Sequence, residues 1–218
     1  MLNGRRCPQF GLLSISSILI IANPLGATLI YVSLTTNMEP HARDIVARDA
    51  CRYAFFILLI VAVIGTWVLS LFGITLEAFR IAGGILLFGI GMEMVYAKTS
   101  RTKLTATEKY ESRDTDDISI MPLAIPMIAG PGAITTTIVL MNEATAMTPV
   151  AIGIVLVSII ISIVLTYYMM RNSDYILTKI GQREYRAINR LMGMLLIAIA
   201  VQFVINGIRL AFPLLSGG

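Results

Sequence analysis

Six long stretches of the chain consist almost entirely of apolar residues, and the polar residues are concentrated between them. These stretches cover residues 10–36, 53–72, 81–97, 118–141, 149–170 and 191–215. Each is close to the length that a helix needs to cross about 30 Å of bilayer hydrocarbon. A transmembrane β-barrel would show alternating segments of about ten residues, and the sequence lacks that pattern. The pattern therefore predicts an all-α polytopic membrane protein with six transmembrane helices.

The composition agrees with this class and excludes others. The 218 residues are 56% hydrophobic and 14% charged, and the mean hydropathy is +0.80. A soluble domain would carry about 25% charged residues, and a disordered chain would combine low hydrophobicity with high net charge. The net charge of +4 comes from basic residues scattered through the connections. We therefore expect no nucleic-acid partner.

The distribution of Lys and Arg among the connections predicts an orientation. Short cytoplasmic loops of membrane proteins carry an excess of these residues. The connections 37–52, 98–117 and 171–190 hold 13 of them, and the connections on the other side hold three. We therefore expect a multi-pass protein of the cytoplasmic membrane, with the three basic loops in the cytoplasm and both termini outside.

Two pairs of similar segments indicate an internal duplication. Ile21-Ala22-Asn23-Pro24 resembles Ile128-Ala129-Gly130-Pro131 at an offset of 107, and residues 80–86 resemble 190–196 at an offset of 110. Three crossings in each half reverse the direction of the second half, so the repeats must be inverted. The predicted organisation is a first three-helix repeat, a charged cytoplasmic linker and a second, inverted repeat, over residues 1–97, 98–117 and 118–218.

Proline and glycine interrupt the first and the fourth apolar stretch near mid-membrane. Pro24 and Pro131 lack a backbone N–H and clash with the carbonyl four residues earlier, so each breaks its helix. Irregular backbone at this depth is tolerated only where protein or a water-filled cavity covers it. Paired broken helices in corresponding positions of two inverted halves are typical of a transporter's binding site. The alternative is a proline kink that binds nothing.

The chemistry of the two breaks suits a small zwitterion. The N–H groups that open each second half-helix attract an anion, and the carbonyls released before each proline attract a cation. Glycines at the breaks leave room only for a small ligand. The predicted substrate-binding residues are Asn23, Pro24, Gly26, Ala27, Thr28, Gly130, Pro131, Gly132, Ala133, Thr135 and Thr136.

Four polar residues elsewhere in the apolar stretches are further candidates. Glu93 is the only carboxylate among them, so a proton-carrier role is one hypothesis, and snorkelling to the nearby interface is the other. Gln202 and Asn206 lie one turn apart and offer amides for interhelical hydrogen bonds or for a secondary polar shell. Arg209 is expected to anchor its helix at the interface, with gating as the alternative.

Four segments carry a likeness to a known family: IIANPLGATLIYVSLT, RIAGGILLFGIGMEMV, IPMIAGPGAITTTIVL and RLMGMLLIAIAVQFVINGI. Together they resemble the MarC family of integral membrane proteins over nearly all of residues 10–212. Archaeal members of that family are described as transporters of small neutral amino acids such as glycine and alanine, driven by an ion gradient. The resemblance thus implies an amino acid transporter.

The sequence bears on three classes of function. A secondary active transporter of glycine, alanine or serine, coupled to a proton in preference to sodium, accounts for both the repeats and the paired breaks. A passive channel or facilitator, or an exporter of another small metabolite, can use the same broken helices. An enzyme is not expected, because the chain has one His, no H-E-x-x-H motif and no P-loop. No metal or cofactor is expected, and a homo-oligomer is an open alternative.

Overall fold

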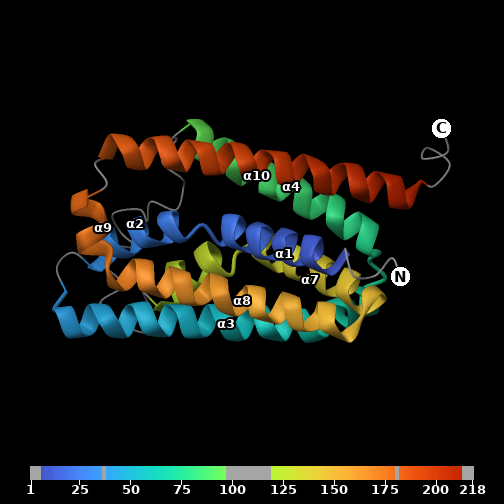
Figure 1. Cartoon of the computed structure of the whole chain (residues 1–218), viewed down its shortest axis with the longest axis horizontal. Coiled ribbons are helices and arrows are strands. Elements are labelled where there is room, and N and C mark those ends of the chain that lie inside the picture. Colours follow the sequence, from blue (N-terminus) through green and yellow to red (C-terminus); the bar gives the residue numbers. More distant parts are fainter. Residues whose placement is uncertain (1–5, 36–37, 97–118, 180–181, 213–218) are drawn as a thin grey trace.

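The computed structural model describes residues 6–35, 38–96, 119–179 and 182–212, and every regular element within these ranges is a helix (Figure 1). The elements are α1 (Arg6–Ala22), α2 (Pro24–Thr35), α3 (Pro40–Leu71), α4 (Leu76–Tyr96), the π-helix η1 (Ser119–Ile128), α7 (Pro131–Met147), α8 (Pro149–Arg171), α9 (Ser173–Lys179) and α10 (Gln182–Ala211). The predicted all-α class is confirmed. The charged linker predicted over 98–117 lies outside the described residues.

The long helices lie along one axis, so the bundle has two ends (Figure 1). One end, which we call the α9 end, holds α9 and the start of α3, where Arg43 meets Asp174. The other, which we call the Glu143 end, holds the start of α4 and the end of α7, where Arg80 meets Glu143. The pair α1–α2 runs toward the α9 end, whereas η1–α7 runs away from it (Figure 1).

Within the described residues, five helical segments are long and apolar enough to cross a membrane: Pro8–Val32, α3, α4, α8 and Ala187–Ala211. The fourth of the six predicted crossings is divided between η1 and α7, which have 10 and 17 residues. Neither part alone is long enough to span about 30 Å of hydrocarbon. The membrane class is thus supported by five candidate spans, and the six-helix inverted repeat stays a prediction.

Two segments predicted as basic loops are largely helical instead. α3 already begins at Pro40, and α9 and α10 cover most of residues 173–190. Proline suits the first turn of a helix, where its missing N–H has no intrahelical partner to lose. Within α3, Arg48 pairs with Asp44 at 2.8 Å, one turn away, and such pairs stabilise polar helical turns. The change in hydropathy predicts where a chain leaves the membrane, and α3 and α10 extend beyond that point.

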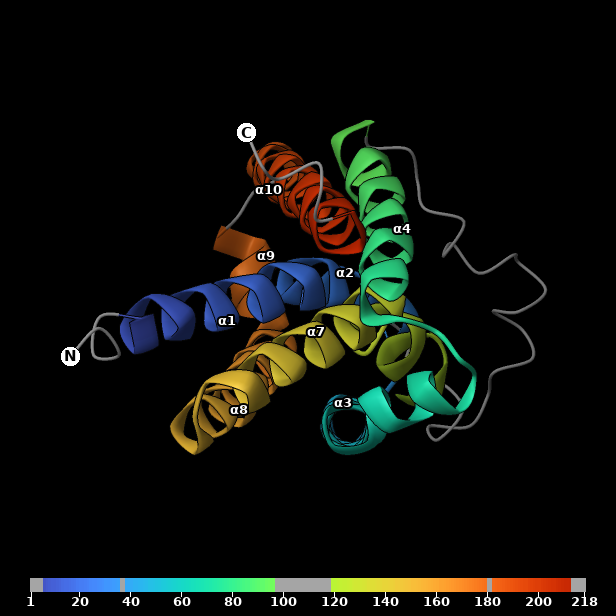
Figure 2. The same cartoon turned by 90° about the vertical axis from the view of Figure 1, so that its right-hand side faces the viewer.

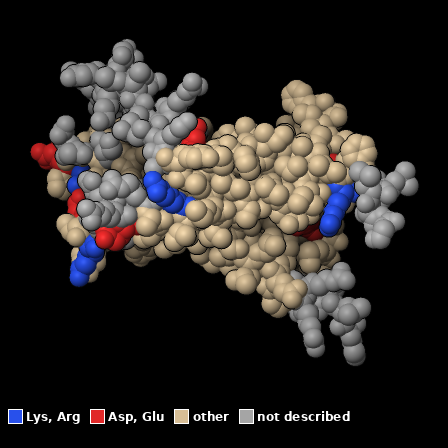
Figure 3. All heavy atoms as spheres, turned by 90° about the horizontal axis from the view of Figure 1, so that it is seen from above, with Lys and Arg blue, Asp and Glu red and all other residues tan. Residues whose placement is uncertain are grey.

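The surface matches a bilayer environment. Large apolar side chains such as Val63, Trp67, Leu86 and Val157 are exposed on the helices between the two ends. In Figure 3 charged side chains gather mainly toward the ends of the visible face, and the band between them is largely uncharged. An exposed apolar girdle with polar ends is the arrangement that hydrocarbon requires of a spanning protein.

α7 lies at the centre of the bundle, and α4 with α10 forms one flank of it (Figure 2). α7 packs against α1, α3, α4 and α8. α4 and α10 approach each other closely because glycines face the contact: a Cβ atom on Gly193 would lie only 2.9 Å from the carbonyl oxygen of Gly91. Small residues at such crossings let membrane helices pack backbone to backbone. Much of α7 is therefore buried among other helices, whereas Pro131 at its start is exposed.

Candidate functional site

The break between α1 and α2 is centred on Asn23. Its backbone has φ 44°, a left-handed conformation that Asn adopts more readily than most residues. Pro24 opens α2 and has no N–H to donate to the carbonyl of Ile20. The side-chain oxygen of Asn23 accepts a hydrogen bond from the N–H of Gly26 at 3.2 Å. Asn23 thus caps the half-helix that follows it.

The same side chain connects this break to α4. The Nδ2 group of Asn23 donates to the sulfur of Met94 at 3.9 Å. Met94 lies against Gly193 of α10, where a Cβ would come within 2.8 Å of the Met94 Cβ. The conformation at the first break is therefore linked by direct contacts to the α4–α10 flank.

The break between η1 and α7 has a different geometry. Pro122 and Pro126 interrupt the α-helical ladder of this segment, and the N–H of Ala129 donates five residues back to the carbonyl of Ala124 at 2.9 Å. α7 then starts at Pro131, after Gly130 with φ −72° and ψ 173°. Gly130 has no side chain to cap the helix, and the N–H groups of Gly132 and Ala133 lie in the first turn, where no intrahelical acceptor is available.

Threonines follow both breaks and divide into two groups. Thr28 donates to the carbonyl of Pro24 at 2.7 Å, and Thr135 donates to that of Pro131 at 2.9 Å. These two hydroxyls satisfy their own helix, as threonine commonly does. Thr136 and Thr137 are fully buried, and neither hydroxyl has a hydrogen-bond partner among the described residues. Buried hydroxyls without a partner are rare enough to require an explanation.

The two breaks are neighbours in the interior. A Cβ on Gly132 would collide with Leu87 of α4 and lie 3.2 Å from the Cγ2 of Ile21, two residues before Asn23. Leu87 is completely buried, as are Ala27 and Ala22. The backbone of α7's first turn is thus covered by Leu87 and Ile21. Of the predicted substrate-binding residues, Asn23 is half-buried, Pro131 is exposed, and Pro24, Gly26, Ala27, Thr28, Gly130, Gly132, Ala133, Thr135 and Thr136 are buried.

The other predicted candidates lie outside this cluster. Glu93 is exposed on α4, next to Met94. Gln202 donates to Asn206 at 2.8 Å, one turn further along α10. Arg209 is exposed near the end of α10. None of these placements tests the proton-carrier, polar-shell or anchoring hypotheses.

Sequence reasoning missed three ion pairs that, among the described residues, join the first half of the chain to the second: Arg80–Glu143, Arg43–Asp174 and Arg171–Asp44, the last at 3.8 Å. Arg80 is 6% exposed and donates to Glu143 at 2.7 Å at the Glu143 end. Arg43 makes two hydrogen bonds, of 3.1 and 3.0 Å, to the carboxylate of Asp174 at the α9 end. Each partner was assigned to a loop in sequence. The available signal was positional: Arg80 and Glu143 adjoin apolar stretches on the same predicted side.

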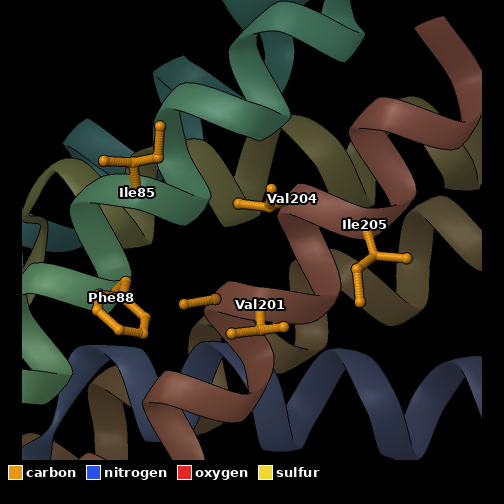
Figure 4. A pocket seen from close by; sticks show the side chains of 6 residues that line it. Ile85, Phe88, Val201, Val204 and Ile205 are labelled. Atoms are coloured by element: carbon orange, nitrogen blue, oxygen red, sulfur yellow. The ribbon is translucent and has the colours of Figure 1, made fainter. Parts of the chain in front are cut away.

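A groove elsewhere in the bundle does not suit a zwitterion, and no cluster of side chains in the described ranges suits a metal ion. A shallow groove between α4 and α10 is lined by hydrocarbon side chains, including Ile85, Phe88 and Val204 (Figure 4). It offers no hydrogen-bond partner to a charged ligand. Within the described ranges, no three His, Cys, Asp or Glu side chains come together as metal ligands would. The helix breaks are therefore the better candidate.

Comparison with known proteins places the chain in a family. The sequence pattern described as "MarC family integral membrane protein" matches residues 9–212. A UPF0056 membrane protein of Methanocaldococcus jannaschii is 41% identical over 204 residues, covering 92% of this chain and 97% of its own. UPF0056 membrane protein YvbG of Bacillus subtilis is 37% identical over 201 residues, covering 92% and 94%.

A third relative, UPF0056 membrane protein YhcE of Escherichia coli, is 33% identical over 193 residues, covering 88% of this chain and 89% of its own. No solved structure matches the chain significantly. The family match covers both helix breaks and the helices around them. The resemblance seen in the four sequence segments is therefore confirmed: the chain belongs to the MarC family of integral membrane proteins.

Proposed function

We propose that this protein is a secondary active transporter of small neutral amino acids, driven by an ion gradient. The observation that carries the proposal is that the two helix breaks meet in the interior. Ile21, two residues before Asn23 of the first break, packs against Gly132 in the first turn of α7. α1–α2 and η1–α7 run in opposite directions through this point (Figure 1). In the proposal they are the broken helices of two inverted three-helix repeats, and the chain crosses the membrane six times.

The proposed ligand is a zwitterion such as glycine, alanine or serine. Its carboxylate suits backbone N–H groups at a helix start, where the helix dipole is positive. Its ammonium suits the carbonyls of Ile20 and Met127, which lose their usual donor to Pro24 and Pro131. A passive facilitator could use the same groups, and accumulation against a concentration gradient distinguishes the two. Protons are favoured over sodium as the coupling ion, with Glu93 as the proposed carrier.

The surroundings of Gly132 support a preference for small ligands. Leu87 and Ile21 cover this backbone, so a ligand reaches it only when these side chains move. Their atoms fill the space beside this backbone, so a large side chain such as that of leucine or phenylalanine would collide with them. In the proposal they form the wall that admits glycine and alanine and rejects leucine or phenylalanine.

Transport in proteoliposomes tests the proposed function. Labelled glycine, alanine and serine are expected to accumulate above their external concentration when a pH or sodium gradient is imposed, and the active gradient identifies the ion. The variant Gly132→Val is expected to lose at least nine-tenths of this uptake (roughly tenfold, as for about 1.4 kcal/mol of binding), because its side chain occupies the site. Uptake that never exceeds equilibrium in wild-type vesicles would contradict active transport.

A paired variant keeps this experiment interpretable. The Cβ of Gly132→Val collides mainly with the end of the Leu87 side chain, so adding Leu87→Ala removes those atoms. The double variant is expected to recover the wild-type melting temperature in detergent more than it recovers uptake. If the double variant both folds and transports glycine at the wild-type rate, the substrate does not use Gly132.

The proposed orientation has its own test. Thr145 and Thr178 are both exposed, at the Glu143 end and the α9 end respectively. Each is replaced by Cys in a background without Cys7 and Cys51, and sealed right-side-out vesicles are treated with an impermeant maleimide. We expect Thr145→Cys to be labelled at once and Thr178→Cys only after permeabilisation. The reverse pattern would invert the orientation and leave the proposed site unchanged.

A further inference from the structure

We propose that the two breaks are not equivalent, and that the N-terminus of α7 alone receives the carboxylate of the ligand. This inference rests on the proposed function for the identity of the ligand. The anion site itself is argued from the capping of the two half-helices and from two buried hydroxyls.

Asn23 and Gly130 occupy corresponding positions at an offset of 107, and they differ in their ability to cap the helix that follows. Asn23 has an oxygen that already accepts the N–H of Gly26. That half-helix is capped by its own chain, and an incoming carboxylate would have to displace the cap. Gly130 has no such oxygen, so α7 begins without a side-chain cap.

Thr136 and Thr137 stand one turn further along α7, four residues after Gly132 and Ala133. Both are fully buried, and their hydroxyls have no hydrogen-bond partner in the part of the chain that the structure describes. A helical side chain leans toward the N-terminus and covers the preceding turn, so these threonines lie over Gly132 and Ala133. Those two residues carry the uncapped N–H groups. The first two turns of α7 therefore hold two backbone donors and two buried hydroxyls.

The corresponding positions in α2 are different. At the same offset, Leu29 and Ile30 stand where α7 has Thr136 and Thr137. These side chains have no hydrogen-bonding group, and the helix start before them is already capped. The first half of the chain thus lacks both components of the anion site. Its contribution is the set of backbone carbonyls before Pro24, which suits the ammonium end.

Burial makes this site selective for a negative charge. Gly132 lies beneath Leu87 and Ile21, and Ala133, Thr136 and Thr137 are buried as well. In a low-dielectric setting, hydrogen bonds from N–H groups to an anion are stronger than in water, and donors without an acceptor are unfavourable. A carboxylate satisfies several of these donors at once. An amine or a neutral amide satisfies them poorly or not at all.

A cap introduced at Gly130 tests the inference. The backbone there, with φ −72° and ψ 173°, has the extended conformation of a capping residue. In Gly130→Ser the new hydroxyl is expected to accept the N–H of Gly132 or Ala133 and compete with the ligand. Gly130→Ala adds the same Cβ without an acceptor and serves as the matched reference. The probes are labelled glycine and unlabelled acetate and glycinamide, with the purified protein in detergent.

We expect Gly130→Ser to bind glycine at least tenfold more weakly than Gly130→Ala and, without ligand, to melt at a higher temperature. Acetate should compete with glycine and glycinamide should not. Thr136→Val, which removes an unpartnered hydroxyl without changing volume, should weaken glycine binding about fivefold and not lower the melting temperature. Equal glycine affinity in Gly130→Ser and Gly130→Ala would overturn the inference.

The outcomes separate this inference from the proposed function. If acetate stabilises the wild type and Gly130→Ala but not Gly130→Ser, while glycine neither binds nor accumulates, the anion site stands and the amino acid assignment is wrong. If glycine accumulates in vesicles and the Ser and Ala variants behave alike, transport stands and the carboxylate binds elsewhere. Asn23→Gly removes the cap of α2. A gain of acetate affinity in this variant would show that the cap from Asn23 is what excludes the carboxylate from the start of α2.

Discussion

Replacing Gly193 by valine is expected to separate α4 from α10 and to prevent accumulation of folded protein. A Cβ at this position would lie 2.8 Å from the Cβ of Met94 and 2.9 Å from the carbonyl oxygen of Gly91. Neither atom is the end of a flexible side chain, so the helices themselves must move apart. Overpacking a core typically costs about 1–3 kcal/mol, and contact with backbone puts this variant at or above the upper end of that range.

The measurement is the melting temperature and monodispersity of the purified protein in detergent. Gly89→Val is the matched control, because no atom lies within 4 Å of a Cβ at Gly89 on α4. That variant should fold as the wild type does. Because Met94 contacts both Gly193 and Asn23, any Gly193→Val protein that is recovered should also have an altered first break. Equal stability of the two variants would mean that α4 and α10 are not in close contact.

Replacing Glu143 by glutamine should destabilise the protein more than replacing Arg80 by glutamine. Arg80 is 6% exposed and Glu143 is 36% exposed, so Glu143→Gln leaves a buried guanidinium without its charge partner. Arg80→Gln leaves a carboxylate that can still reach water. Removing one partner of a fully buried pair costs about 3–5 kcal/mol, and the partial exposure of Glu143 lowers our expectation to about 2–3 kcal/mol.

The double variant Arg80→Met with Glu143→Leu provides the control. It removes both charges and fills the space with apolar side chains, which is often neutral or stabilising. Its melting temperature should therefore exceed that of Glu143→Gln. The pair also joins the two halves of the chain at one end. If Glu143→Gln leaves the melting temperature unchanged, the ion pair contributes nothing to the stability of the fold.

The sequence by itself determined the class of the protein, its helical content and the residues at which α2 and α7 begin. These features depend on local chemistry. Long apolar runs require a bilayer, and a residue without an N–H ends a hydrogen-bond ladder wherever it stands. Pro24 and Pro131 open α2 and α7 for that reason. The basic segments were assigned to loops because hydropathy reports the membrane boundary and says little about where a helix starts.

Only the tertiary structure decided which polar groups have partners. Arg80 and Glu143 are 63 residues apart, and no periodicity connects them. The cover that Leu87 and Ile21 form over Gly132 depends on how α4 and α1 pack against α7. Such contacts arise from the packing of distant helices, which local composition does not specify.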